Sequence, residues 1–202
     1  MKSVLCSLLF LAYLAPTSVH AETILGNLPP ANDDTQFAQH SNLRKKAKSF
    51  TMPAGESTNI GNLTLRLRNY TTAGEVVAEL RNDSGDPQIP GDTILLSFEV
   101  PPPGGEDIQD YILTPSDSYT LQAETTYWLI VYGIDGGSFD WMASDPGITP
   151  TGIASFLNAH FTTNGGSIWS SSSIINSFEL KEWVNPNIFH DRFEETDPDP
   201  VE

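Results

Sequence analysis

Cysteine is nearly absent from this sequence, because Cys6 is the single cysteine among 202 residues. It lies in an N-terminal segment that we expect to be removed, so the mature chain would have no disulfide, no thiolate metal site and no cysteine nucleophile. The few histidines form no His-Glu-x-x-His motif or other close pair that could hold a catalytic zinc ion. The sequence also lacks a Gly-x-Ser-x-Gly motif, and with it the nucleophile elbow of a serine hydrolase.

Basic residues are the second deficit: 10 Lys and Arg face 26 Asp and Glu, which gives a formal net charge of −16. Phosphate binding needs a dense basic surface, so we expect neither nucleic acid nor an anionic membrane as the main partner. After the N-terminal segment no apolar run is long enough to cross a bilayer, so no transmembrane segment is predicted in the mature chain. The hydrophobic content of 39% still allows a packed core and argues against a wholly disordered chain.

Residues 1–21 have the parts of a secretory signal peptide. Lys2 gives a positive start, the stretch from Val4 to Ala15 is almost wholly apolar, and Ala21 supplies the small residue that signal peptidase requires. The apolar stretch is too short for a hydrocarbon core of about 30 Å, which argues against a permanent membrane helix. We therefore predict export, with the mature chain secreted or held at the cell surface.

The middle of the chain alternates apolar and polar residues with a period of two, which indicates β-strands. Leu63, Leu65 and Leu67 fall on one face of such a strand, and residues 76–80 repeat the pattern. Residues 127–132 are apolar on both faces, which favours a strand buried in the middle of a sandwich.

Turns rich in Pro, Gly and Asp separate these segments about every eight to twelve residues, which is typical of an all-β sandwich or barrel. We predict an all-β fold, a single antiparallel β-sandwich of jelly-roll type, over residues 22–184. Only residues 151–160 show weak helical spacing, and helix, strand and loop all stay open there.

Residues 185–202 have a different composition. After Glu194 the chain has two prolines among acids and almost no apolar side chain. This composition predicts an acidic, disordered tail. Residues 188–194, Ile-Phe-His-Asp-Arg-Phe-Glu, resemble the Ile-Phe-x-Asp-Gly-Phe-Glu signature found near the ends of many exported bacterial proteins, with Arg192 at the glycine position. A last short strand that docks two aromatic rings is the alternative for this segment.

The turn at residues 82–86, Asn-Asp-Ser-Gly-Asp, is the best metal candidate. Asp83 and Asp86 offer the hard oxygen ligands that calcium prefers, and glycine allows the tight backbone of such loops. The same residues also make an ordinary hairpin turn by Asx and Gly chemistry, so calcium and a plain turn both stay open. Residues 135–137 with Asp140 offer a weaker version of the same pattern.

Tryptophan provides the candidates for sugar binding, because pyranose faces stack on exposed aromatic rings. Trp169 lies in a loop-like setting after Gly165-Gly166, and Asn164 is placed to grip a hydroxyl group. Trp141 follows Asp140 in a similar setting, whereas Trp128 has apolar neighbours that predict a core position. Packing in the core is the alternative role for Trp169 and for Trp141.

Charged residues offer two further candidates. Glu79, Glu99 and Glu179 alternate with apolar neighbours and are expected to face solvent, so no acid pair for glycoside hydrolysis can be chosen. Residues 44–48, Arg-Lys-Lys-Ala-Lys, form the one basic run. It is interpreted either as solvated lysines at the entrance of a strand or as a patch for an anionic surface polymer or another molecule's acidic tail.

Several stretches together carry a resemblance to a known family: Leu63-Thr64-Leu65-Arg66-Leu67, Val76-Val77-Ala78-Glu79-Leu80, Ile89-Pro90-Gly91-Asp92-Thr93-Ile94-Leu95, Leu121 to Val131, Trp141, Gly165-Gly166-Ser167-Ile168-Trp169 and Phe178-Glu179-Leu180. They resemble the bacterial choice-of-anchor secreted domains, most nearly choice-of-anchor R. The resemblance implies a jelly-roll-like sandwich exposed on or near the cell surface, and it implies no catalytic residues.

The function expected from the sequence is therefore that of an exported binding or structural module at the cell surface or in the extracellular matrix, and not an enzyme. Its expected ligands are a glycan or calcium, and its expected partner is an extracellular polysaccharide or a cell-surface component. The alternative is a glycan-active enzyme, a glycoside hydrolase or lyase, that uses an Asp/Glu pair on a jelly-roll scaffold.

Overall fold

The computed structural model describes residues 21–33, 36–55, 57–86, 88–135 and 139–184. The predicted tail and all but the last residue of the predicted signal peptide lie outside these ranges. Within them the chain forms thirteen strands and no helix, so no helix among these residues could span a membrane. The strands are β1 Thr23–Gly26, β2 Gln36–His40, β3 Lys45–Thr51, β4 Thr58–Arg68, β5 Val76–Asp83, β6 Pro90–Glu99, β7 Gln109–Pro115, β8 Thr120–Leu121, β9 Thr126–Gly133, β10 Phe139–Ala143, β11 Ser155–Thr162, β12 Ser170–Ser171 and β13 Phe178–Glu182.

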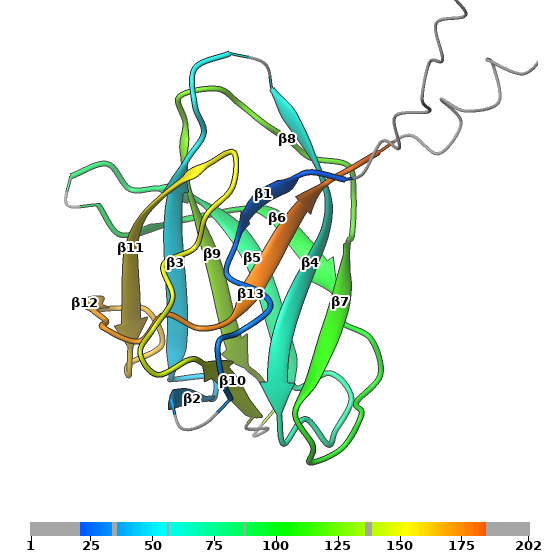
Figure 1. Cartoon of the computed structure of the whole chain (residues 1–202). Helices are drawn as coiled ribbons and strands as arrows, with labels where there is room; N and C mark the ends of the chain where they lie inside the picture. The colour runs from blue at the N-terminus through cyan, green and yellow to red at the C-terminus, as the bar shows by residue number, and fades with distance from the viewer. Residues whose placement is uncertain (1–20, 34–35, 56, 87, 136–138, 185–202) are drawn as a thin grey trace, which may run out of the picture.

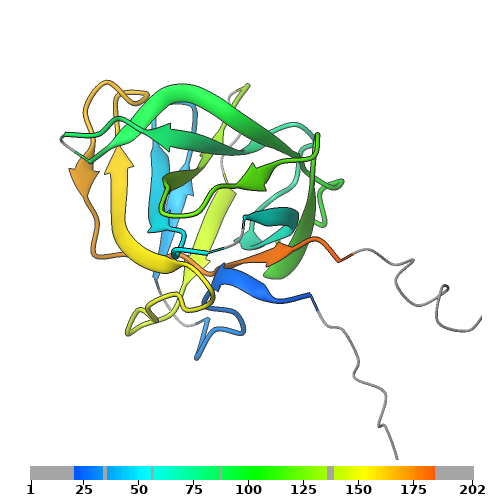
Figure 2. The same cartoon turned by 90° about the horizontal axis from the view of Figure 1, so that it is seen from above.

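All of the strand pairs described are antiparallel, and they build two layers that face each other across the core (Figures 1 and 2). One layer contains β1, β13, β4 and β7, with β10 attached to β4 and β2 attached to β10. The other layer runs β6, β5, β9, β3, β11 and β12. The layers are joined where β6 pairs with β7 at only two positions, Phe98 with Pro115 and Glu99 with Thr114. The predicted all-β antiparallel sandwich is confirmed.

The main core lies between the layers and is built by the predicted alternation. Leu63, Leu65 and Leu67 of β4 are fully buried and face the core from one layer. From the other layer, Leu129 and Val131 of β9 enter the same cluster. Burying apolar surface in this way is the main driving force of folding.

Strand β9 is buried on both faces, as its sequence predicts. Trp128 and Ile130 point away from the main core, are fully buried, and form a second apolar cluster with Ala47 of β3. Tyr132 and Trp169 are partly buried and pack against this outer cluster. The outer face of β9 therefore has its own apolar cover, and that cover holds the candidate site described below.

The segment at residues 151–160, left open by the sequence, is mostly strand. Residues 155–162 form β11, which pairs with β3 from Ser155 opposite Thr51 to Thr162 opposite Lys45. The register shifts between Phe156 and Asn158, which is the signature of a β-bulge. The bulge explains the weak helical spacing, because an extra residue in a strand breaks the period of two.

Trp141 contradicts the prediction that it binds a ligand. Its ring is fully buried, and its indole Nε1 donates a hydrogen bond of 2.9 Å to the carbonyl oxygen of Ser177. The cause is the position of β10, which pairs with β2 on one side and with β4 on the other, so all five residues of this strand are buried. A sugar ring cannot reach Trp141, and its alternative role in the core is correct.

Replacing Trp141 with alanine should lower the free energy of unfolding by about 3–5 kcal/mol, because it leaves a large cavity in the core. Chemical denaturation followed by tryptophan fluorescence or circular dichroism measures this loss. Replacement of Trp183, whose side chain is 53% exposed, is the control and should cost far less. Equal losses in the two variants would contradict the assignment of Trp141 to the core.

Candidate functional site

The candidate site is a groove on the outer face of the β3–β9–β5 layer, beside the outer apolar cluster. We call it the Trp169 groove, and it encloses about 280 Å³. Its walls come from strands β3, β5 and β9, from the start of β6, and from the segment before β12. The lining residues are Lys45, Arg81, Pro90, Asp92, Ile130, Gly165, Gly166, Ser167 and Trp169.

The groove continues as a wider hollow of about 600 Å³ along the hairpin that joins β5 to β6. The two parts share Pro90, Asp92, Gly166, Ser167 and Trp169. Trp169 therefore lies where the two parts meet. An extended groove of this kind suits a chain-like ligand better than a compact one.

Trp169 combines the two roles that the sequence left open. Its side chain is half-buried and packs on the outer cluster, which contains Trp128 and Ile130, while the same residue lines the groove. Gly166, with a φ of 110° that favours glycine, brings the backbone close to the indole ring. The ring is thus fixed from below by apolar contacts, as a stacking surface requires.

Asn164 does not line the Trp169 groove, so its predicted contact with a sugar is not supported by the geometry. Its side-chain Oδ1 accepts hydrogen bonds from the Thr162 hydroxyl (2.7 Å) and from the backbone N–H of Ile168 (3.0 Å). These bonds hold the turn that carries Trp169. Asn164 is therefore a positioning residue for the loop.

The charges beside the groove are arranged around Glu79, which corrects the expectation that this side chain faces solvent. Glu79 does lie on the outer face, as its alternation predicts, but the cover over that face leaves it only 1% exposed. Arg81 donates from Nε to Glu79 Oε1 at 2.7 Å. The Nζ of Lys45 lies 4.0 Å from the ring centroid of Tyr132, and burial is the main cause that lowers the pKa of Lys45.

The predicted calcium ligands have different roles in the structure. Asp83 accepts a 2.7 Å hydrogen bond from the indole N–H of the buried Trp128 and a 3.1 Å bond from the backbone N–H of Gly85. The second bond is the Asx turn of the plain-turn alternative. Asp86 is exposed, and the described ranges contain no group of three or more His, Cys, Asp or Glu side chains that could hold a metal. A calcium role stays a prediction.

The second predicted calcium site, at residues 135–137 with Asp140, is not assembled by the described residues. Residues 136–137 lie outside them. Asp140 is 5% exposed and accepts hydrogen bonds of 2.9 and 2.8 Å from Arg68 and of 2.8 Å from Asn69. It therefore forms a structural ion pair.

The basic run contradicts the expectation of solvated lysines. Lys46 is 7% and Lys48 is 0% exposed, because β3 is a central strand and these two residues share its inner face with Phe50. The Nζ of Lys48 donates to the carbonyl oxygen of Ile174 at 2.9 Å and lies 5.5 Å from the ring centroid of Trp141. Burial lowers the pKa of Lys48 well below its ordinary value and lowers the pKa of Lys46 to about 8.

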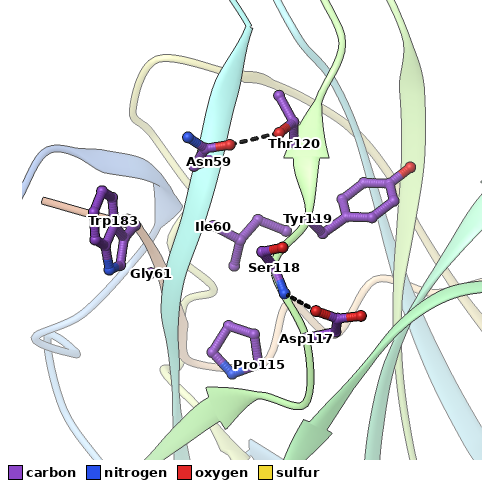
Figure 3. A pocket seen from close by; sticks show the side chains of 9 residues that line it. All are labelled: Asn59, Ile60, Gly61, Pro115, Asp117, Ser118, Tyr119, Thr120 and Trp183. Carbon is purple, nitrogen blue, oxygen red and sulfur yellow. Dashed lines mark hydrogen bonds between the residues drawn. The ribbon is translucent and has the colours of Figure 1, made fainter. Parts of the chain in front are cut away.

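A second cleft lies at the opposite part of the fold, where β4, the β7–β8 connection and the end of β13 meet (Figure 3). It encloses about 600 Å³ and is lined by Asn59, Ile60, Gly61, Pro115, Asp117, Ser118, Tyr119, Thr120 and Trp183. A Cβ on Gly61 would lie 2.3 Å from the carbonyl oxygen of Glu182, so only glycine lets β13 approach here.

Trp183 was missed as a surface ring, although a signal was present. Phe178 and Leu180 are buried, so the alternation of β13 places Trp183 on the other face, where it is 53% exposed. Two hydrogen bonds cross or border the cleft: the Thr120 hydroxyl donates to Asn59, and Asp117 accepts from the backbone N–H of Ser118. We treat the Trp169 groove, where an aromatic ring meets two connected hollows, as the stronger site.

The sequence was compared with protein-family models and with curated protein sequences. No protein-family model matches the chain, and no curated protein sequence matches it. The resemblance to choice-of-anchor domains is therefore carried only by the residues given above and stays a prediction.

Replacing Asp83 with alanine should lower the free energy of unfolding by about 1–3 kcal/mol, because the buried N–H of Trp128 loses its acceptor. Asp86→Ala, at an exposed position of the same turn, is the matched control and should change stability by less than about 0.5 kcal/mol. Thermal melts with and without calcium complete the experiment. A rise in the melting temperature with calcium that either substitution abolishes would favour the metal site over the plain turn.

The free energy of unfolding should rise with pH between about 8 and 10. Lys46 and Lys48 bind fewer protons in the folded state than in the unfolded state in this window, because burial lowers their pKa values only in the folded protein. Urea titrations at several pH values measure the slope. Lys46→Met should reduce it, whereas Lys181→Met, at the surface of β13, should leave it unchanged. Stability that falls with pH over this window would contradict the prediction.

Proposed function

We propose that this protein is an exported binding module that holds an extracellular polysaccharide in the Trp169 groove. The observation that carries the proposal is the half-buried ring of Trp169 at the junction of two connected hollows, fixed from below by the outer apolar cluster. Stacking on a rigid aromatic ring is how proteins recognise the apolar face of a sugar.

The polar groups of the groove support a hydroxyl-rich ligand. Asp92 and Ser167 are exposed beside Trp169 and can accept or donate hydrogen bonds, and Lys45 can donate from its ammonium group. Gly165 and Gly166 leave the backbone of the loop open to a ligand. Apolar rings combined with a few convergent polar groups are typical of ligand sites.

The alternative, a glycan-active enzyme, finds less support in the same groove. Hydrolysis of a glycosidic bond uses two carboxyl groups on opposite sides of the bond. The Trp169 groove and its continuation contain a single carboxylate residue, Asp92. A neighbouring hollow does include two, Asp83 and Glu124, but Asp83 is the acceptor of the buried Trp128 N–H. The arrangement favours binding over turnover.

Export and surface location are part of the proposal and rest on the sequence. The N-terminal segment has the charge, the apolar run and the small cleavage-site residue of a signal peptide. The stretches that resemble choice-of-anchor domains include Trp169 itself. A surface-exposed binding module is the role that agrees with both features.

Trp169→Ala should weaken binding to a recognised polysaccharide by about 1 kcal/mol or more, because the stacking surface is lost. It should also lower the free energy of unfolding by about 1–2 kcal/mol, since the ring is only half-buried in the outer cluster. A panel of extracellular polysaccharides, read by isothermal titration calorimetry and in parallel by a reducing-sugar assay, measures binding and turnover separately.

Two further variants sharpen the test. Trp169→Phe keeps an aromatic ring and should retain most of the binding, and Ile168→Ala, at the adjacent 67% exposed position, should leave binding unchanged. Binding that survives Trp169→Ala would remove the groove as the site. If the protein turns over a polysaccharide and a folded Asp92→Asn variant does not, the protein is a glycan-active enzyme and not a binding module.

A further inference from the structure

Half of the basic residues that the structure describes have no acidic partner. Four of them are ion-paired with a carboxylate: Arg66, Arg68, Arg81 and Lys181. The other four all belong to the basic run, and none of them makes an ion pair with a described carboxylate: Arg44, Lys45, Lys46 and Lys48. In a protein with a net charge of −16, acidic partners are abundant, so positive charge left without one at a single place indicates a site for an external anion.

Three of these bases, Arg44, Lys45 and Lys46, line a small pocket at the start of β3. It encloses about 80 Å³ and is lined by His40, Arg44, Lys45, Lys46, Phe161, Thr162 and Thr163. This volume is too small for a sugar ring with its substituents or for a drug-sized ligand, which needs at least about 300 Å³. It is large enough for a few water-sized groups and so for a small polyatomic ion.

Three residues that line this pocket carry hydrogen-bond donors, two at the start of β3 and one just after β11. Arg44 is exposed, and its guanidinium offers the planar pair of donors that matches an oxyanion. The Nζ of Lys46 donates one hydrogen bond, to the hydroxyl of Ser172, and an ammonium group has three N–H donors. Thr163 adds an exposed hydroxyl, whereas the Thr162 hydroxyl is used by Asn164.

Three further residues, Lys45, His40 and Lys48, line the pocket or lie near it. The Nζ of Lys45 lies over the ring of Tyr132 on the outer face of β3, the side of the Trp169 groove, so the proposed anion site does not use it. His40 also lines the pocket, and its ring stacks on Phe139 with a centroid distance of 5.1 Å. Lys48 lies two residues beyond Lys46 on the same inner face. Burial disfavours the charged form of Lys46, and an anion bound beside it would favour that form.

We propose that this pocket, formed by Arg44, Lys46 and Thr163, binds a small tetrahedral oxyanion, sulfate or phosphate, either free or carried as an ester on an extracellular polymer. The site is separate from the Trp169 groove and does not need Trp169. The two share Lys45, and the turn after Thr162 runs from one to the other. A polymer held in the groove could therefore place an ester group in the pocket.

The test titrates the purified protein with sodium sulfate, with sodium phosphate and with sodium chloride at low ionic strength. Binding is followed by amide NMR shifts and by calorimetry. Sulfate or phosphate should shift the amides of Arg44, Lys46 and Thr163 at concentrations where chloride does not. Arg44→Gln should weaken binding about tenfold, because a charge-assisted hydrogen bond is lost. Lys181→Gln, which removes one positive charge far from the pocket, should leave binding unchanged.

A second arm identifies the source of the anion. A sulfated polysaccharide is compared with its desulfated form, each with the wild-type protein, with Arg44→Gln and with Trp169→Ala. Preference for the sulfated form that Arg44→Gln removes assigns the site to a polymer-borne ester. Binding of the inorganic ions alone, without such a preference, assigns it to the free ion.

Two results would overturn the proposal: no shift at these amides with either inorganic ion, or equal weakening by Arg44→Gln and Lys181→Gln, which would show only general charge attraction. Failure of the proposed polysaccharide function gives a different result. In that case Trp169→Ala does not weaken polysaccharide binding, while the inorganic ions still shift the amides of the pocket.

Discussion

The antiparallel register of β3 on β9 is the constraint on which the rest of the structure depends. Lys45 lies opposite Tyr132 and Thr51 lies opposite Thr126, with no bulge between them. This register sends Phe50, Leu129 and Val131 into the main core, and it sends Ala47, Trp128 and Ile130 to the outer face. A slip by one residue would exchange the two sets, so the apolar content of both faces fixes the pairing.

The same register determines where charge is buried. Lys46 and Lys48 follow Phe50 to the inner face, where burial disfavours their charged forms. On the outer face of β5, which lies on the other side of β9, Glu79 is covered to the same degree, but Arg81 compensates it directly. The protein thus neutralises its buried acid internally and leaves its buried bases with carbonyl, hydroxyl and aromatic contacts. This asymmetry supports the proposed anion site at the start of β3.

The outer apolar cluster connects stability to recognition. Trp128 is held at its indole N–H by Asp83, and its ring lies edge-on to His160 at 5.1 Å. Trp169 packs against this cluster, so the residue that offers a ring to a ligand also belongs to the apolar cover of the outer face. A binding surface built on such a cluster is rigid, because movement of the ring would expose apolar area. The groove is therefore preformed by packing.

Local sequence patterns by themselves determined several features: alternation gave β4 and β5, a continuous apolar run gave β9 and its burial on both faces, and Asx and Gly residues gave the turn at Asp83. These features depend only on neighbours in the chain. Alternation also placed Glu79 on the outer face of its strand, but it could not show that loops from distant parts of the chain cover that face. The basic run carries no apolar alternation, so its inner and outer residues were set only by pairing with β9 and β11. Trp141 and Trp169 both follow glycine- or acid-rich turns, and only the tertiary structure placed one between two strands and the other at a groove. Which faces are covered depends on contacts between segments far apart in sequence, and a local pattern holds no information about them.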